Sequence, residues 1–142
     1  MNWDLIKKSE KLKVDMQMTT LMIMQPFYEE HGMNFLKLAI LSEADSVENL
    51  TLNVLAQSVG KATANLSVVV TTLVNDGYLK KVASGYDRRV TYIHITKKGK
   101  NIVEKSHDFL LSRYAQTMEN DTEIIELIHA QENYLAKLRQ IR

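Results

Sequence analysis

The chain has 142 residues, of which 45% are hydrophobic and 25% charged, and these proportions are ordinary for one globular domain. No apolar run approaches the roughly 18 residues of a membrane-spanning helix, and charged residues interrupt the N-terminal stretch where a signal peptide would be apolar. From these two observations we expect a cytoplasmic protein with no membrane partner. Cysteine is absent, which excludes disulfides and thiol-based redox sensing.

The net charge of +1 is distributed unevenly along the sequence. Residues 77–105 contain eight Lys or Arg and two acidic residues, a local charge of +6, so the rest of the chain carries −5. A basic region on an otherwise acidic body is typical of a surface that binds a polyanion. Ordinary solvated lysines would give the same count, and charge alone does not decide between the two.

Residues 1–30 are predicted to form one long helix, because apolar side chains recur there at helical spacing between polar ones. Pro26, the only proline, should kink or end this helix. Five methionines lie between Met16 and Met33. Their flexible side chains suit a helix interface or core, which is the favoured interpretation, or the lining of a ligand pocket.

A second helix is expected from a cap at or near Asn34 to about Ser42, with Phe35 on its buried face. Residues 42–49 are polar and are predicted to form a connection between helices.

Two short helices are predicted next, separated by Gly60 in a left-handed turn. Thr51 should cap the first and Thr63 the second, which should end near Asp76. Four β-branched residues at 69–72 would also suit a strand. Helical periodicity over nine residues decides for a helix, on the spacing of Leu66, Val69, Val70, Leu73 and Val74.

Residues 78–82 and 89–95 are predicted to form two paired strands. The basic connection between them contains Gly85, where we expect a turn with positive φ. A further helix should run from a cap at Thr96 to about Met118.

A break at residues 120–122 should cap the last helix. This helix has more apolar residues than one face of a monomer needs, which indicates an oligomer interface.

No arrangement typical of catalysis or of metal binding is present. The four histidines are isolated in sequence, the glycines do not form a phosphate-binding loop, and no nucleophile elbow occurs. We therefore expect neither enzymatic activity nor a metal or cofactor.

Four short motifs occur in a fixed order: Leu52-x-x-Leu55-Ala56-x-x-x-Gly60, Gly77-Tyr78-Leu79, Asp87-Arg88-Arg89 and Ile95-Thr96-x-x-Gly99. Together they resemble the MarR family of bacterial transcriptional regulators. The resemblance implies a mainly α fold with a small β-wing, a winged helix-turn-helix, in a single domain. Within it, residues of about 1–34 and 107–142 would form dimerisation helices, and about 35–106 would form the DNA-binding lobe.

The resemblance also implies a function: sequence-specific binding to double-stranded DNA by a homodimer, more often as a repressor. A recognition helix would enter the major groove of a pseudo-palindromic operator, and the wing would enter the flanking minor groove. Asp87 would hold Arg89 in place by a local ion pair. The residues expected to contact DNA are Thr63, Ala64, Asn65, Ser67, Val68, Thr72, Lys80, Arg88 and Arg89, with Lys81, Lys97 and Lys98 as further phosphate contacts.

The recognition helix departs from the family pattern because its exposed positions are neutral, with Val68 where an Arg is usual. Arg is the commonest reader of guanine, whereas Asn65 suits adenine and methyl groups suit thymine, so an A·T-leaning operator is predicted. The same departure supports an alternative: a winged-helix module that binds another protein and has weak or no sequence-specific DNA binding.

Many relatives bind small aromatic or phenolic effectors between the dimer helices and the DNA-binding lobe. A comparable pocket is a hypothesis here, with core packing as the favoured alternative. Its residues would be Met16, Met24, Phe27, Tyr28 and His31.

Overall fold

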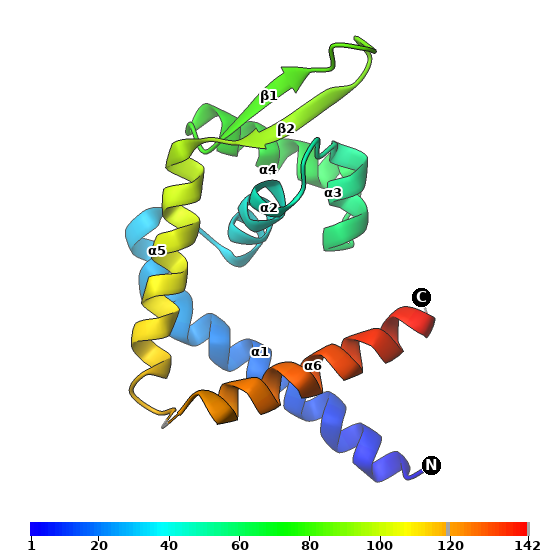
Figure 1. Cartoon of the computed structure of the whole chain (residues 1–142), viewed down its shortest axis with the longest axis vertical. Coiled ribbons are helices and arrows are strands. Elements are labelled where there is room, and N and C mark those ends of the chain that lie inside the picture. Colours follow the sequence, from blue (N-terminus) through cyan, green and yellow to red (C-terminus); the bar gives the residue numbers. More distant parts are fainter. Residues whose placement is uncertain (119, 142) are drawn as a thin grey trace. The chain divides into compact units, whose positions relative to one another are not determined.

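Within residues 1–118 and 120–141, which the computed structural model describes, the chain forms six helices and two strands (Figure 1). The mainly α fold with a small β-wing is confirmed. The chain divides into two compact units, Met1–Ser106 and His107–Arg142. The elements are α1 (Trp3–His31), α2 (Phe35–Ser46), α3 (Leu52–Val59), α4 (Thr63–Asn75), β1 (Leu79–Ala83), β2 (Thr91–Ile95), α5 (Lys97–Tyr114) and α6 (Asp121–Ile141).

The long first helix is present as predicted and ends at Gly32, whose φ of 63° is left-handed. Pro26 does not end it, because the helix continues to His31. A proline in a helix removes one main-chain hydrogen bond. Met24 and Phe27, which flank it, are only 3% and 2% exposed, so burial of this turn offsets the loss.

Helix α2 differs from its prediction at its C-terminus and on one face. Asn34 caps it as expected, by accepting the main-chain N–H of Lys37 at 2.8 Å. The helix continues to Ser46, because Ala44 is buried and the Ser46 hydroxyl bonds back to a main-chain carbonyl four residues earlier. Phe35 is 58% exposed, so its predicted place on the buried face is wrong.

The core of the first unit lies where α2, α3 and α4 pack together and against the two strands. Helix α4 is helical, as its periodicity predicted, and its Leu66, Val70 and Leu73 are almost fully buried. Its N-cap is Ala62, so the prediction of Thr63 as a cap is wrong by one residue. Ala62 has no side-chain acceptor, and the helix begins without a side-chain cap.

The strands β1 and β2 form an antiparallel hairpin, with Leu79 opposite Ile95 and Ala83 opposite Thr91. The N–H of Ile93 also donates to the carbonyl of Leu50 at 2.7 Å, which ties the segment before α3 to the hairpin. The predicted strand pair is confirmed, with ends shifted by one or two residues.

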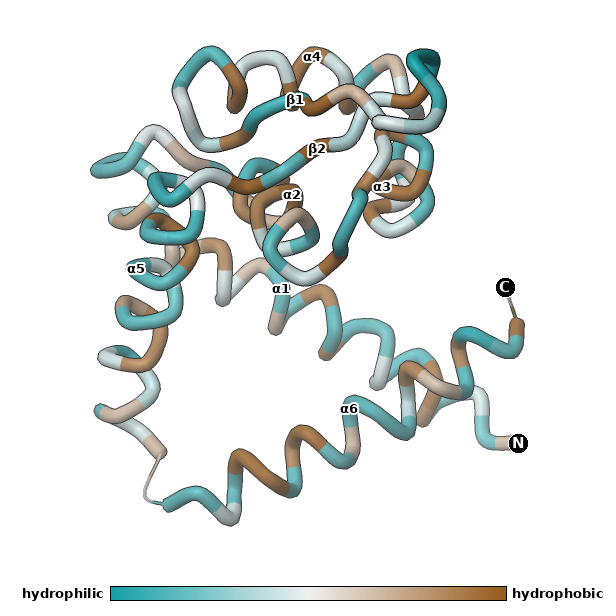
Figure 2. The backbone as a smooth tube through the Cα atoms, turned by 45° about the horizontal axis from the view of Figure 1, so that its top comes forward, coloured by the Kyte–Doolittle hydropathy of each residue, from teal (hydrophilic) through white to brown (hydrophobic). Residues whose placement is uncertain are grey.

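Helix α5 ends at Tyr114, four residues before the predicted end. Asn120 accepts the N–H groups of Thr122 and Glu123 and so caps α6, as expected. None of the described α6 side chains is buried, and apolar residues recur along this helix (Figure 2). No described helix is both long and apolar enough to span a bilayer.

Candidate nucleic-acid interface

Helices α3 and α4 form the helix-turn-helix. Thr51 caps α3 by accepting the N–H of Val54 at 3.3 Å, and Gly60 ends it with a left-handed φ of 64°. Only Lys61 and Ala62 then separate the turn from α4. The short turn is possible because glycine adopts this conformation without a steric cost.

The outer face of α4 is polar or weakly apolar and has no charged side chain. Thr63, Ala64 and Asn65 are exposed at its start, and Val68 is 69% exposed one turn later. Two further predicted DNA contacts, Ser67 and Thr72, are half-buried, and the Thr72 hydroxyl donates to the carbonyl of Val68 at 3.1 Å. This face therefore offers one amide, small hydroxyls and methyl groups to a partner.

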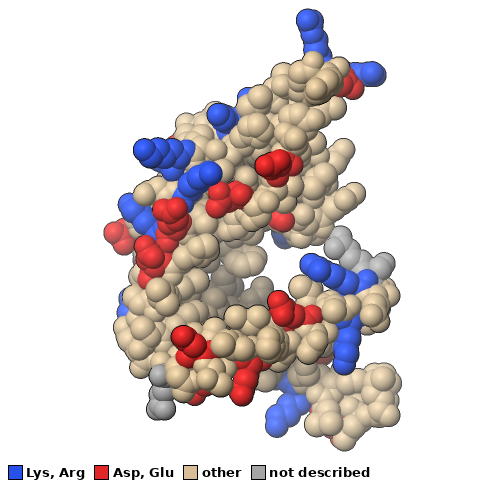
Figure 3. All heavy atoms as spheres, in the orientation of Figure 1, with Lys and Arg blue, Asp and Glu red and all other residues tan. Residues whose placement is uncertain are grey.

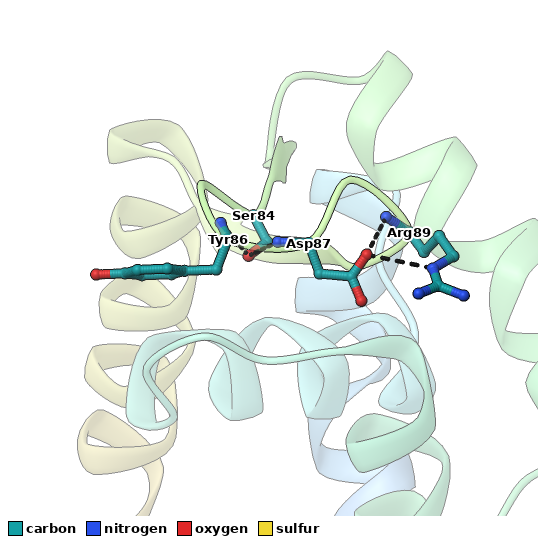
Figure 4. A network of polar contacts seen from close by, with 4 residues as sticks. All are labelled: Ser84, Tyr86, Asp87 and Arg89. Carbon is teal, nitrogen blue, oxygen red and sulfur yellow. Dashed lines mark hydrogen bonds and ion pairs between the residues drawn. The ribbon is translucent and has the colours of Figure 1, made fainter.

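The tip of the β1–β2 hairpin is held by a network of short polar contacts (Figure 4). The buried hydroxyl of Ser84 accepts the N–H groups of Tyr86 at 3.2 Å and Asp87 at 3.3 Å. The N–H of Ser84 donates to the carbonyl of Val90, and the N–H of Val90 donates to that of Asp87. These bonds close the turn, so we name residues 84–90 the wing loop.

The prediction of a positive φ at Gly85 is wrong. The glycines with positive φ are Gly32, Gly60 and Gly77. Ser84 organises the turn instead, through a side-chain bond to the main chain two residues on. Serine at the start of a polar turn is a recognised sequence signal for this arrangement, which the prediction missed.

The two arginines of the wing loop differ in their tethering. Oδ1 of Asp87 accepts the N–H of Arg89 at 2.9 Å and lies 3.4 Å from its Nε, so the predicted ion pair is present. The Arg89 side chain is nevertheless 92% exposed. Arg88 is also exposed and, within the described residues, has no hydrogen bond or ion pair. Basic side chains therefore project from the hairpin tip beside one acidic group (Figure 3).

Lys80 and Lys81 lie on opposite faces of the hairpin, because neighbouring residues alternate along a strand. Lys81 shares a small cleft with Ser67 and Val70 of α4. Lys80 lies instead in a cleft that also contains Asp45 and Glu48. Of these two predicted phosphate contacts, the structure thus brings Lys81 and not Lys80 beside the recognition helix.

Lys98 has a structural partner at the end of α4. Its Nζ donates to the carbonyl of Asp76 at 2.6 Å and lies 4.4 Å from the ring centroid of Tyr78. A lysine at a helix C-terminus is favoured by the helix dipole. This side chain is therefore less available to phosphate than that of Lys97, which is exposed.

The residues predicted for a ligand pocket do not line one common cavity. Met24 and Phe27 belong to the core, and the Phe27 ring lies 4.4 Å from that of His31. Met16 is 45% exposed. Tyr28 lines an apolar cavity of about 230 Å³. Burial raises the pKa of the Tyr28 phenol, which stays protonated at neutral pH.

Sequence reasoning missed the other walls of this cavity. Phe35 and Gln17 line it, and both also line an adjoining cavity of about 610 Å³ formed by α1, α2 and α3. Phe35 was predicted to lie on the buried face of its helix, whereas the structure places it, 58% exposed, at the wall of both cavities.

The sequence and the structure each match known regulators. The family described as transcriptional regulator SarA/Rot matches residues 6–106. No match to the sequence was found among curated proteins.

Several solved structures share the fold over nearly their whole length. A MarR transcriptional regulator from Methanosarcina mazei Go1 has a TM-score of 0.81 at 14% identity, covering 96% of this chain and 99% of that one. FabT from Streptococcus pneumoniae, solved in complex with DNA, has a TM-score of 0.77 at 17% identity, covering 96% and 99%. A MarR family protein from Bacillus stearothermophilus has a TM-score of 0.76 at 21% identity, covering 99% and 96%.

At these identities the structural likeness establishes the fold, a MarR-type winged helix, and so confirms the fold that the four motifs implied. The sequence match covers most of the chain, and the matched family consists of transcriptional regulators. The chain belongs to the SarA/Rot family of DNA-binding transcriptional regulators.

Proposed function

We propose that the protein is a sequence-specific repressor that binds a pseudo-palindromic operator as a homodimer. The observation that carries this proposal is the pairing of an exposed, uncharged α4 face with an ordered, doubly basic wing loop. The neutral helix face can approach base edges, while Arg88 and Arg89 supply positive charge toward the backbone and the minor groove. FabT, which shares the fold, was solved with DNA, and this supports the same use of the fold here.

The chemistry of α4 favours A·T base pairs. Asn65 can bind adenine through two hydrogen bonds, and the methyl groups of Ala64 and Val68 can contact the thymine methyl. The exposed face has no arginine to bind guanine. Lys81 stands next to this face and suits a phosphate contact.

Exposed apolar side chains on the terminal helices support the homodimer. In α6 they are 36–83% exposed, and in the N-terminal part of α1 several exceed half exposure. Apolar area of this extent is favourable to bury in a partner, at about 25 cal/mol per Å². A two-fold dimer requires an operator with matching symmetry. The exposed apolar residues of the terminal helices are Trp3, Leu5, Leu12, Val14 and Met18 in α1, and Ile125, Leu127, Ile128, Tyr134, Leu135, Leu138 and Ile141 in α6.

A small aromatic effector is proposed to bind in the cavities that share Gln17 and Phe35. Their walls come from α1, α2 and α3, so an occupant would act directly on the first helix of the helix-turn-helix. The smaller cavity is almost entirely apolar and has the protonated Tyr28 phenol as a hydrogen-bond donor. CouR from Rhodococcus jostii RHA1, which shares the fold, was solved with p-coumaroyl-CoA.

Selection of bound fragments from a genomic DNA library tests the proposal. We expect the protein to enrich A·T-rich pseudo-palindromes, and its affinity to fall with salt by a log–log slope of about −0.9 per neutralised phosphate. The double variant Arg88→Ala/Arg89→Ala should lose most of the enrichment. Lys7→Ala/Lys8→Ala is a matched control, because it removes two exposed positive charges from α1, outside the winged helix-turn-helix. Enrichment of no sequence by the native protein would favour the protein-interaction module.

A further inference from the structure

Tyr86, in the wing loop, is the most exposed of the large apolar and aromatic side chains. Its relative exposure is 104%, above the 97% of Met1 at the chain end. Most of a tyrosine ring is apolar, and a fully exposed ring gains free energy when a partner covers it.

The ring is exposed from an ordered main chain, not from a loose loop. The N–H of Tyr86 donates to the buried hydroxyl of Ser84, and the next N–H, that of Asp87, donates to the same oxygen. Figure 4 shows the ring projecting from the loop away from the Asp87–Arg89 pair. Because the main chain is already fixed and the side chain has only two torsions, Tyr86 would lose little conformational entropy when a partner binds it.

The charge next to Tyr86 in the wing loop indicates the kind of partner that would cover the ring. Arg88 lies two residues away with an exposed side chain and no bond to another described residue. An exposed aromatic ring and an exposed guanidinium on one short loop, at the tip of a two-stranded hairpin, suit a narrow groove with anionic edges and apolar walls. The minor groove of DNA has this character, since phosphates line its edges and deoxyribose its walls.

We propose that Tyr86 is a DNA contact of the wing, with its ring packed against the deoxyribose wall of the minor groove beside Arg88. This inference rests on the proposed function. The contact adds affinity that does not depend on salt. This matters for a protein whose recognition helix has no charged side chain to contact bases. The phenolic hydroxyl faces water or a groove acceptor and contributes less than the ring.

The test compares Tyr86→Ala, Tyr86→Phe and Arg88→Ala on the operator obtained by selection, with the affinity of each measured over a range of salt concentrations. Tyr86→Ala removes the ring from both wings of the dimer and should weaken binding about 25-fold, at about fivefold for each wing. Since tyrosine is uncharged, the salt slope of Tyr86→Ala should equal that of the native protein. Arg88→Ala removes one contact from each wing of the dimer and should lose about 1.8 of slope, at about 0.9 for each contact. Tyr86→Phe should bind within about twofold of the native protein, because it keeps the ring.

Two results would overturn the proposal. One is a Tyr86→Ala protein that binds as tightly as the native protein. The other is an affinity loss accompanied by the slope loss of Arg88→Ala, which would mean that the substitution disturbs the loop and not a contact of the ring. In both cases a weakened Arg88→Ala would leave the proposed function standing, and only a native protein that selects no DNA would remove both.

Discussion

The hydroxyl of Thr96 lies 2.6 Å from the carbonyl oxygen of Gly77 and 3.0 Å from that of Tyr78, so its hydrogen is shared between them. The same oxygen accepts the N–H of Gly99 at 3.1 Å. One threonine therefore joins the turn after the recognition helix to the first turn of α5. Two motifs that are separate in the sequence, Gly-Tyr-Leu and Thr-x-x-Gly, form a single structural element, which we name the Thr96 junction.

Gly99→Ala should destabilise the protein, although alanine is the better helix former. A β-carbon at Gly99 would lie 2.6 Å from Cγ1 of Ile95 and closer still to the carbonyl oxygen of Tyr78. Helix propensity favours alanine by about 1 kcal/mol, but overpacking against main chain costs about 1–3 kcal/mol. The main chain of the Thr96 junction cannot move away from the new β-carbon without breaking the hydrogen bonds of Thr96. A urea titration followed by circular dichroism should therefore show a lower midpoint.

Gly85→Ala is the matched control for this substitution. An added β-carbon there meets nothing within 4 Å, and the φ of Gly85 is not positive. The urea midpoint should change by less than the equivalent of about 0.5 kcal/mol. A Gly99→Ala protein as stable as this control would contradict the close approach at the Thr96 junction.

The sequence predicted most elements because their signals are local. Asn34 and Thr51 cap their helices through their own side chains, and Gly32 and Gly60 end helices through their own main-chain freedom. The boundary of α2 was missed for the opposite reason. Burial of Ala44 against the rest of the unit holds a polar segment in helix, and a single sequence does not reveal that contact.

The site was predictable in its motifs but less so in its geometry. The Asp87–Arg89 pair is two residues apart, so the spacing alone made the contact reachable. By contrast, strand register decides that Lys81 and not Lys80 lies beside α4, and a one-residue shift exchanges the two faces. The sequence placed the strand start one residue early, and basic composition cannot distinguish adjacent lysines.

Asp87→Ala should weaken DNA binding, although it removes a negative charge from a DNA-binding loop. Coulomb repulsion alone predicts tighter binding for the variant. The structure predicts the reverse, because Oδ1 of Asp87 fixes the main chain and side chain of Arg89, which would otherwise lose entropy on binding. We expect a several-fold loss of operator affinity with a stability change below about 1 kcal/mol, since the ion pair is largely exposed.

Asp87→Asn separates these two effects. The amide keeps an oxygen that can accept the Arg89 N–H and removes the negative charge. Its affinity should equal or exceed that of the native protein in a fluorescence anisotropy titration. If the alanine variant bound more tightly than the native protein, repulsion would outweigh positioning and the role assigned to Asp87 would be wrong.

Asn65→Ala should relax sequence specificity at one base pair of each half-site. Asn65 is exposed on the first turn of α4 and can bind adenine in a bidentate manner, which is worth about 1–3 kcal/mol of discrimination. Selected operators should then show a weaker preference at a single symmetric position, measured by the base frequencies of the enriched pool. Asn75→Ala, at the other end of the same helix, is the control and should leave every position unchanged.

Ile128→Glu/Leu135→Glu in α6 should convert the protein to a monomer and weaken operator binding. The two side chains are 45% and 46% exposed and lie two helical turns apart on the apolar face. Since neither is buried, charge on them costs little in the isolated chain but much in a dimer interface, where it would be desolvated without a partner. Light scattering at micromolar concentration should report half the native mass. Asn133→Glu adds a charge to the opposite face of α6 and should leave the mass unchanged; a native protein that is already monomeric would remove the reason for a two-fold operator.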